Sequence, residues 1–157
     1  MARLRAWGAA MSVTAIAEAL ISAIRAGRLV DAVADLYDPE AVVVEGHWSD
    51  VGAPLRGHVE IRAAYEARAA LVKPAEMDVA GPFLSGPQTT DAGRFALQFH
   101  GRLVSHDGRF AQDVRSVGVF EVEGGRIVRQ EFFLPPATVP VEPSVRWPAM
   151  RGVEEAG

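Results

Sequence analysis

The chain lacks cysteine, has no run of basic residues and contains no apolar segment of membrane-spanning length. Without cysteine, disulfides, thiolate zinc sites and cysteine nucleophiles are excluded together. A formal net charge of −4 argues against nucleic acid or an anionic membrane surface as a partner. The stretch from Met1 to Ala10 has no apolar run of signal-peptide length, so we expect a cytoplasmic protein.

What the chain does contain suits one globular domain. Its 157 residues are 49% hydrophobic and 23% charged, which is enough to bury about 70% of the unfolded surface without disulfides. We expect a flexible N-terminal arm over residues 1–12, a folded domain over 13–135 and a proline-rich C-terminal tail over 136–157. Met11 is an alternative start, and the tail is expected to pack on the domain or on a second subunit.

Apolar residues at helical spacing predict three helices in the first half of the chain: Thr14 to Ala26, Leu29 to Tyr37 and His58 to Val72. Between the second and third helices, Ala41 to Glu45 predicts a short strand that ends in a carboxylate. Met77 to Leu84 predicts an edge strand that is interrupted at Gly81-Pro82.

The second half of the chain predicts the main sheet. From Gly93 to Leu134, apolar runs are broken only at Ser105 to Gly108 and at Glu123 to Gly125, which is typical of three antiparallel strands joined by tight turns. In both turns the last glycine suits a left-handed residue that closes a three-residue loop.

Loop length decides which side chains share a face of this sheet. Three-residue loops would place His100 opposite Val114 and Gly118 opposite Gln130. One face would then mix small, polar and aromatic side chains, as a pocket wall does: Gln98, His100, Val114, Ser116, Gly118, Phe120, Gln130 and Phe132. A two-residue Gly-Gly turn would instead shift the last strand and exchange Gln130 for Glu131.

The opposite face would be apolar in its middle, as a core or a partner surface is. It would carry Phe95, Leu97, Phe99, Val117, Val119 and Glu131, with Asp113 and Arg115 near its end. Because this face would lie away from the pocket, we expect the chain to form a homodimer through it.

In this order, these segments resemble the nuclear transport factor 2-like superfamily. The resemblance is carried by Ala26-Gly27, by the run from Tyr37 to Gly46, by Arg56-Gly57 and by the closing hairpin. Members include ketosteroid isomerases, SnoaL-type polyketide cyclases, limonene epoxide hydrolase and scytalone dehydratase. It implies an α+β fold, a cone-shaped α+β barrel with three N-terminal helices packed on a curved, mostly antiparallel sheet. This fold hosts enzymes and plain binding modules alike.

The resemblance also implies roles for two titratable residues. Glu45 falls where ketosteroid isomerases keep their general-base aspartate, and His100 lies near the strand aspartate of the epoxide hydrolase. The chain departs from these relatives at Leu20, where the isomerases keep an oxyanion tyrosine, and at Phe132, where the cyclases keep a carboxylate. From the residues alone, Glu45 also suits a solvated carboxylate at the sheet rim, and His100 a hydrogen-bonded strand histidine.

We therefore predict an enzyme that uses neither cofactor nor metal and acts on a small apolar ketone or polyketide-like molecule. Glu45 would be the base and His100 the proton partner in isomerisation, aldol-type cyclisation or dehydration. The substrate would contact Trp48, Gln98, Ser116, Phe120, Gln130 and Phe132. A non-catalytic ligand-binding or dimerisation domain and an epoxide hydrolase are the alternatives.

Overall fold

The computed structural model describes residues 10–47, 50–51, 53–86 and 89–134. The predicted tail, most of the predicted arm and Trp48 lie outside these residues. Among the described residues, no helix is long and apolar enough to cross a membrane.

Three helices form where the apolar spacing predicted them, with ends that differ by one residue. They are α1 (Val13–Arg25), α2 (Leu29–Leu36) and α3 (Gly57–Leu71). The first begins at Ser12, whose hydroxyl oxygen accepts a hydrogen bond from the Ala15 backbone N–H at 3.2 Å. It ends before Gly27, which adopts a left-handed conformation with φ of 69°.

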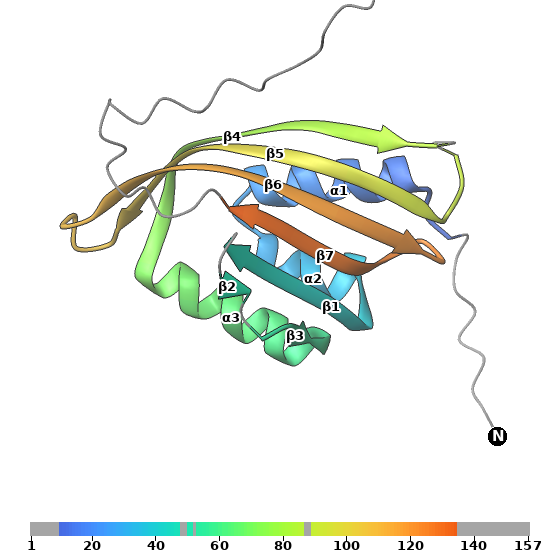
Figure 1. Cartoon of the computed structure of the whole chain (residues 1–157), viewed down its shortest axis with the longest axis horizontal. Coiled ribbons are helices and arrows are strands. Elements are labelled where there is room, and N and C mark those ends of the chain that lie inside the picture. Colours follow the sequence, from blue (N-terminus) through green and yellow to red (C-terminus); the bar gives the residue numbers. More distant parts are fainter. Residues whose placement is uncertain (1–9, 48–49, 52, 87–88, 135–157) are drawn as a thin grey trace, which may run out of the picture.

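Seven strands form one curled sheet, and the predicted α+β architecture is confirmed. They are β1 (Tyr37–His47), β2 (Asp50–Val51), β3 (Leu55–Arg56), β4 (Val72–Ser85), β5 (Gly93–Ser105), β6 (Ala111–Glu123) and β7 (Arg126–Leu134). The order is β2-β1-β7-β6-β5-β4, with β3 paired to β1, and it can be followed from the bottom of Figure 1 to β4 at the top. Among the described strands only the β1 and β7 pairing is parallel, so the sheet is mostly antiparallel as predicted.

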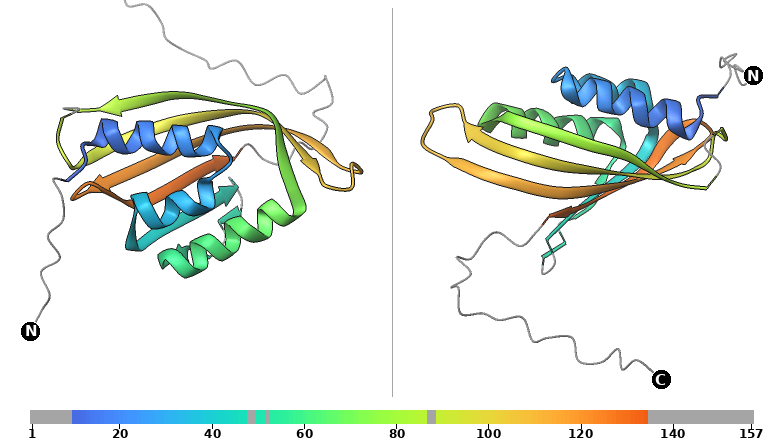
Figure 2. Two further views of the ribbon diagram at one scale, coloured as in Figure 1. Left: turned by 180° about the vertical axis from the view of Figure 1, so that it is seen from behind. Right: turned by 90° about the horizontal axis from the view of Figure 1, so that it is seen from above.

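The helices lie on one side of the sheet, which Figure 2 shows from above. Between the helices and the sheet is an apolar core whose largest fully buried side chains include Tyr37, Phe95, Phe120, Ile16 and Leu20. The outer edge strand β4 carries the predicted irregularity, because its pairing with β5 shifts between Ala80 and Phe83, around the cis Gly81-Pro82 peptide.

The predicted register between β5 and β6 is wrong by one residue. His100 pairs with Arg115 and Gln98 with Val117, because the turn has four residues rather than three. Gly108 is left-handed as predicted, with φ of 72°. Arg109 nevertheless belongs to the loop, since its N–H donates to the Asp107 carboxylate at 3.0 Å instead of to a strand partner. The shift turns every side chain of β5 to the other face.

The predicted turn between β6 and β7 is also wrong, yet the face predicted for β7 is right. The turn has two residues, Gly124 and Gly125, both with positive φ, as a type I′ hairpin requires. A bulge at Val128 adds one unpaired residue to β7, which cancels the effect of the shorter turn. Gln130 therefore faces the helices together with Phe120, its partner on β6.

Candidate functional site

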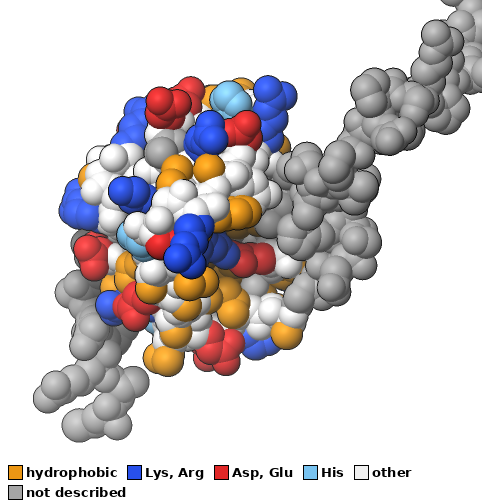
Figure 3. Space-filling view, turned by 90° about the vertical axis from the view of Figure 1, so that its left-hand side faces the viewer, with side chains coloured by type: hydrophobic (Ala, Val, Ile, Leu, Met, Phe, Trp, Pro, Cys, Tyr) orange, Lys and Arg blue, Asp and Glu red, His pale blue; other side chains and the backbone are white. Residues whose placement is uncertain are grey.

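The helices and the concave side of the sheet enclose a cavity of about 710 Å³. Residues at the end of α3 and the start of β4 are part of its lining. Figure 3 looks onto this side of the molecule, where charged and apolar side chains lie close together. The lining is mostly apolar with a few polar groups, as is typical of small-molecule sites. The polar residues of the lining include Glu45, Arg68, Tyr37, Tyr65, Gln130 and Ser116.

Glu45 contributes a carboxylate to this cavity from β1. It pairs across the sheet with Phe132, and both side chains line the cavity. An Arg68 guanidinium nitrogen, from α3, donates to both carboxylate oxygens, at 2.5 and 2.6 Å. The ion pair is partly open to water, with 29% of the Glu45 side chain and 46% of the Arg68 side chain exposed. The pair therefore orients the carboxylate without adding much to stability.

A second polar group lies deeper and consists of Tyr37, Tyr65 and Gln130, which we call the tyrosine–glutamine cluster. Its members come from β1, α3 and β7, and their exposed fractions are 0%, 4% and 2%. Both tyrosine hydroxyls donate to the Gln130 side-chain oxygen, that of Tyr65 at 3.3 Å and that of Tyr37 by a shorter contact. Three residues far apart in sequence thus satisfy one another inside an apolar region.

Burial controls the ionisation of these hydroxyls. Removal from water disfavours the phenolate, which raises the pKa of Tyr65 to about 12. The nearby negative charge of Glu45 acts in the same direction, although more weakly. Burial also raises the pKa of Tyr37 well above its ordinary value, assisted by Tyr65. Both hydroxyls therefore keep their protons at neutral pH and act as hydrogen-bond donors.

Four of the residues predicted to contact a ligand line this cavity: Ser116, Phe120, Gln130 and Phe132. The aromatic rings are organised in pairs, with Phe95 and Phe120 stacked at 4.7 Å between centroids and Phe99 and Phe132 tilted at 5.4 Å. Trp48, the fifth, lies outside the described residues.

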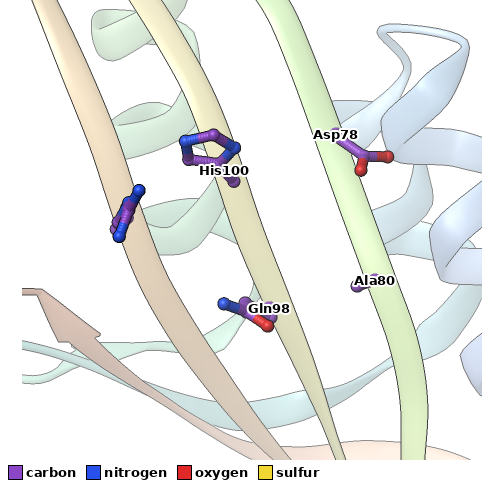
Figure 4. A pocket seen from close by; sticks show the side chains of 5 residues that line it. Asp78, Ala80, Gln98 and His100 are labelled. Carbon is purple, nitrogen blue, oxygen red and sulfur yellow. The ribbon is translucent and has the colours of Figure 1, made fainter.

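Gln98 and His100 lie elsewhere, and the prediction that they face the pocket is wrong. Their side chains project from the outer face of the sheet, where Figure 4 shows them beside Asp78 and Ala80 of β4. They line a separate shallow cleft of about 330 Å³. The four-residue turn is the reason, because it places Phe95, Leu97 and Phe99 of β5 on the inner face instead. Glu45 and His100 therefore do not point into one cavity.

The sequence reasoning missed Tyr37, Tyr65 and Arg68, among other polar residues of the cavity. Tyr65 and Arg68 were assigned only to a helix, and Tyr37 only to the apolar side of one. A signal was present, because Tyr65 and Arg68 are three residues apart and so share a helix face, with the guanidinium 5.8 Å from the ring centre. Nothing in the local pattern shows that Gln130 would accept from both tyrosines.

Within the described residues, no cluster of three acidic or histidine side chains could hold a metal ion.

Comparison with known proteins agrees with the fold. Residues 17–130 match the model of the SnoaL-like domain family. No protein of curated function matches the sequence.

Many solved structures share the fold. A candidate SnoaL-like polyketide cyclase from Mesorhizobium loti is 20% identical with a TM-score of 0.66, covering 78% of this chain and 98% of its own. A ketosteroid isomerase-like protein from Erwinia carotovora is 13% identical with a TM-score of 0.58, covering 78% of this chain and 92% of its own. A candidate isomerase from Bacillus subtilis, also 13% identical, has a TM-score of 0.58 and covers 76% and 83%. At these identities the likeness concerns the fold alone.

Proposed function

Because this chain belongs to the SnoaL-like domain family, we propose that it is an acid–base enzyme acting on a small apolar carbonyl compound. The reaction class is proton transfer next to the carbonyl group, as in isomerisation, aldol-type cyclisation or dehydration. The observation that carries the proposal is one cavity of about 710 Å³ shared by the Glu45 carboxylate and a buried set of hydrogen-bonding groups. No cofactor is required by this chemistry.

The spacing of the polar groups supports this reaction. Glu45 pairs with Phe132, which follows Gln130 by two residues on β7. Along the strand direction, the backbone positions of Glu45 and Gln130 are therefore about 7 Å apart. A carbonyl compound bridges that distance when its oxygen lies at the cluster and its neighbouring carbon lies at Glu45. The carboxylate would take a proton from that carbon, and hydrogen bonds would stabilise the enolate oxygen until the proton returns at another position.

Arg68 has a positioning role in this proposal. It donates to both oxygens of the Glu45 carboxylate from the side of α3, which limits the rotation of a carboxylate that lines the cavity. The predicted proton partner, His100, has no part in it, because that side chain lies on the outer face of the sheet. The cavity replaces it with the hydroxyl and amide groups of the cluster.

The test is replacement of Glu45 by glutamine, which keeps the shape of the side chain and removes its basicity. The assay is exchange of solvent deuterium into flat cyclic ketones and polyketide-like diketones. Since positioned proton transfer typically contributes about 10²- to 10⁴-fold, Glu45→Gln should lower the exchange rate by that factor with little change in thermal stability. The matched control is Glu121→Gln, whose carboxylate pairs with Arg94 on the outer face and should leave exchange unchanged.

A non-catalytic ligand-binding domain is the second candidate. Two observations favour it: Glu45 already has an ion-pair partner, and Phe132 occupies the place where the cyclases keep a carboxylate. If wild type and Glu45→Gln exchange deuterium equally while both bind the ketone, the binding domain becomes the better account.

A further inference from the structure

We infer that the Gln130 side-chain amide binds the oxygen atom of the ligand, and that the cavity therefore selects molecules with an acceptor oxygen, such as ketones. This inference rests on the proposed function, because it names the group that receives the carbonyl oxygen in that reaction. It assigns Gln130 to ligand binding and Tyr37 and Tyr65 to positioning.

Two tyrosines fix the orientation of the Gln130 side-chain amide. Tyr37 and Tyr65 both donate to the Gln130 side-chain oxygen, which uses both of its acceptor positions. The two tyrosines thus hold the oxygen side of the amide toward β1 and α3. The NH₂ group of Gln130 is left with two donors that the tyrosines do not use.

The NH₂ group of Gln130 has no acceptor among the described residues and borders the cavity. Gln130 is only 2% exposed, yet no described residue accepts a hydrogen bond from its side-chain nitrogen. Within the described part of the chain, however, no fully buried side-chain nitrogen or oxygen lacks a partner. The nitrogen must therefore reach the surface of the cavity that Gln130 lines. Because a desolvated donor without an acceptor is unfavourable, an acceptor atom in the cavity next to this nitrogen is favoured.

Gln130 and Glu45 line the same cavity from neighbouring strands. Both residues line the cavity, because Glu45 on β1 pairs with Phe132, and Phe132 is two residues from Gln130 on β7. Glu131, between Gln130 and Phe132, pairs with Val44 and faces the other way. A ketone whose oxygen accepts from the Gln130 amide would place its neighbouring carbon toward the carboxylate. The raised pKa values of Tyr37 and Tyr65 keep both hydroxyls protonated, so the amide stays in this orientation at neutral pH.

The experiment uses β-tetralone as the ketone and tetralin as the matched hydrocarbon, because the two differ only at the carbonyl group. Wild type should bind β-tetralone about 10-fold more tightly than tetralin, as expected for one hydrogen bond to a desolvated donor. The infrared carbonyl stretch of the bound ketone should lie at lower frequency than in an apolar solvent. Equal affinity for the two molecules, or an unshifted carbonyl stretch, overturns the inference.

Gln130→Met keeps the side-chain length and removes the amide, so the frequency shift should disappear and the ketone preference should fall to within about twofold. Gln98→Met is the matched control, because Gln98 lies on the outer face and both readouts should stay as in wild type. A frequency shift that persists in Gln130→Met overturns the inference. Tyr65→Phe, which removes one of the two donors that orient the amide, should weaken the shift without abolishing it.

If Gln130→Met does not fold, NMR of nitrogen-labelled wild type decides the question. The Gln130 NH₂ resonances, assigned with Gln130→Glu, should move on addition of β-tetralone and remain in place with tetralin. Resonances that respond to neither molecule, or equally to both, overturn the inference. The Glu45→Gln variant separates the two proposals, because it should lose deuterium exchange and keep the carbonyl shift. In wild type, deuterium exchange without a carbonyl shift would contradict the assignment of Gln130 alone, whereas a carbonyl shift without exchange would contradict the proposed function alone.

Discussion

At the scale of single residues, the cavity depends on side chains whose neighbours satisfy them only in the folded chain. Gln130, Tyr37 and Tyr65 come from three different elements, and each would be costly to bury alone. Glu45 differs, because its ion pair with Arg68 is partly exposed and each partner can be solvated.

The two tyrosines offer a direct titration, since Tyr37 and Tyr65 are the only tyrosines of the chain. Their pKa values are raised on folding, that of Tyr65 from 10.0 to about 12. The stability that this shift represents is therefore fully present below pH 10 and is lost as the pH rises toward about 12. We expect the tyrosinate absorbance of the native protein to stay low at pH 10 and to rise only near pH 12 or on unfolding.

The same linkage predicts the behaviour of a variant. The free energy of unfolding of wild type, measured with denaturant, should fall between about pH 10 and pH 12 by roughly 2 kcal/mol more than that of Tyr65→Phe. A tyrosinate titration with a midpoint near 10 in the folded protein would contradict the burial of both hydroxyls.

At the scale of elements, turns and bulges decide which face each strand presents. The β5 to β6 turn is held by side chains, because Asp107 accepts from Arg109 and from the Ser105 hydroxyl, at 3.0 and 2.6 Å. These hydrogen bonds lower the pKa of the Asp107 carboxyl below its usual value. Between β6 and β7 the type I′ turn and the Val128 bulge each shift the pairing by one residue in the same direction. Because side chains alternate between the faces, the two shifts together leave Gln130 on the inner face.

Strand β6 also has to make room for the aromatic rings of the cavity. A Cβ atom at Gly118 would lie 2.9 Å from the Phe120 ring and 3.3 Å from the Phe99 ring. We expect Gly118→Ala to displace these rings and to lower the free energy of unfolding by about 1 to 3 kcal/mol. Ala111→Val, at the exposed start of the same strand, is the control and should change it by less than about 0.5 kcal/mol. Equal effects of the two substitutions, measured by denaturant unfolding, would contradict the close packing over Gly118.

At the scale of the whole molecule, three of the apolar residues predicted to form a dimer interface are not available. Phe95, Leu97 and Phe99 are covered by the helices of the same chain and belong to the core. The outer face instead presents Phe83, Val117 and Phe133, which are 56%, 39% and 48% exposed.

A homodimer through this outer face stays a prediction. Light scattering at micromolar concentration should give twice the monomer mass of 16.8 kDa. Val117→Glu should shift the protein toward monomer, because it would bury a charge between two copies. Val59→Glu is the control, since Val59 lies on α3 and is 83% exposed. A monomer mass for wild type would rule out this mode of association.

The sequence alone determined the elements, because helical spacing, β-branched runs and glycine turns are local properties. It indicated the three helices, the edge strand with its break, and the inner position of Gln130, although the last through two errors that cancelled. The tertiary structure decided the face of β5, since one extra loop residue held by Asp107 reverses every side chain along the strand. It also decided the polar centre of the cavity. Tyr37 and Tyr65 are 93 and 65 residues from Gln130, and only folding makes one amide oxygen their common acceptor.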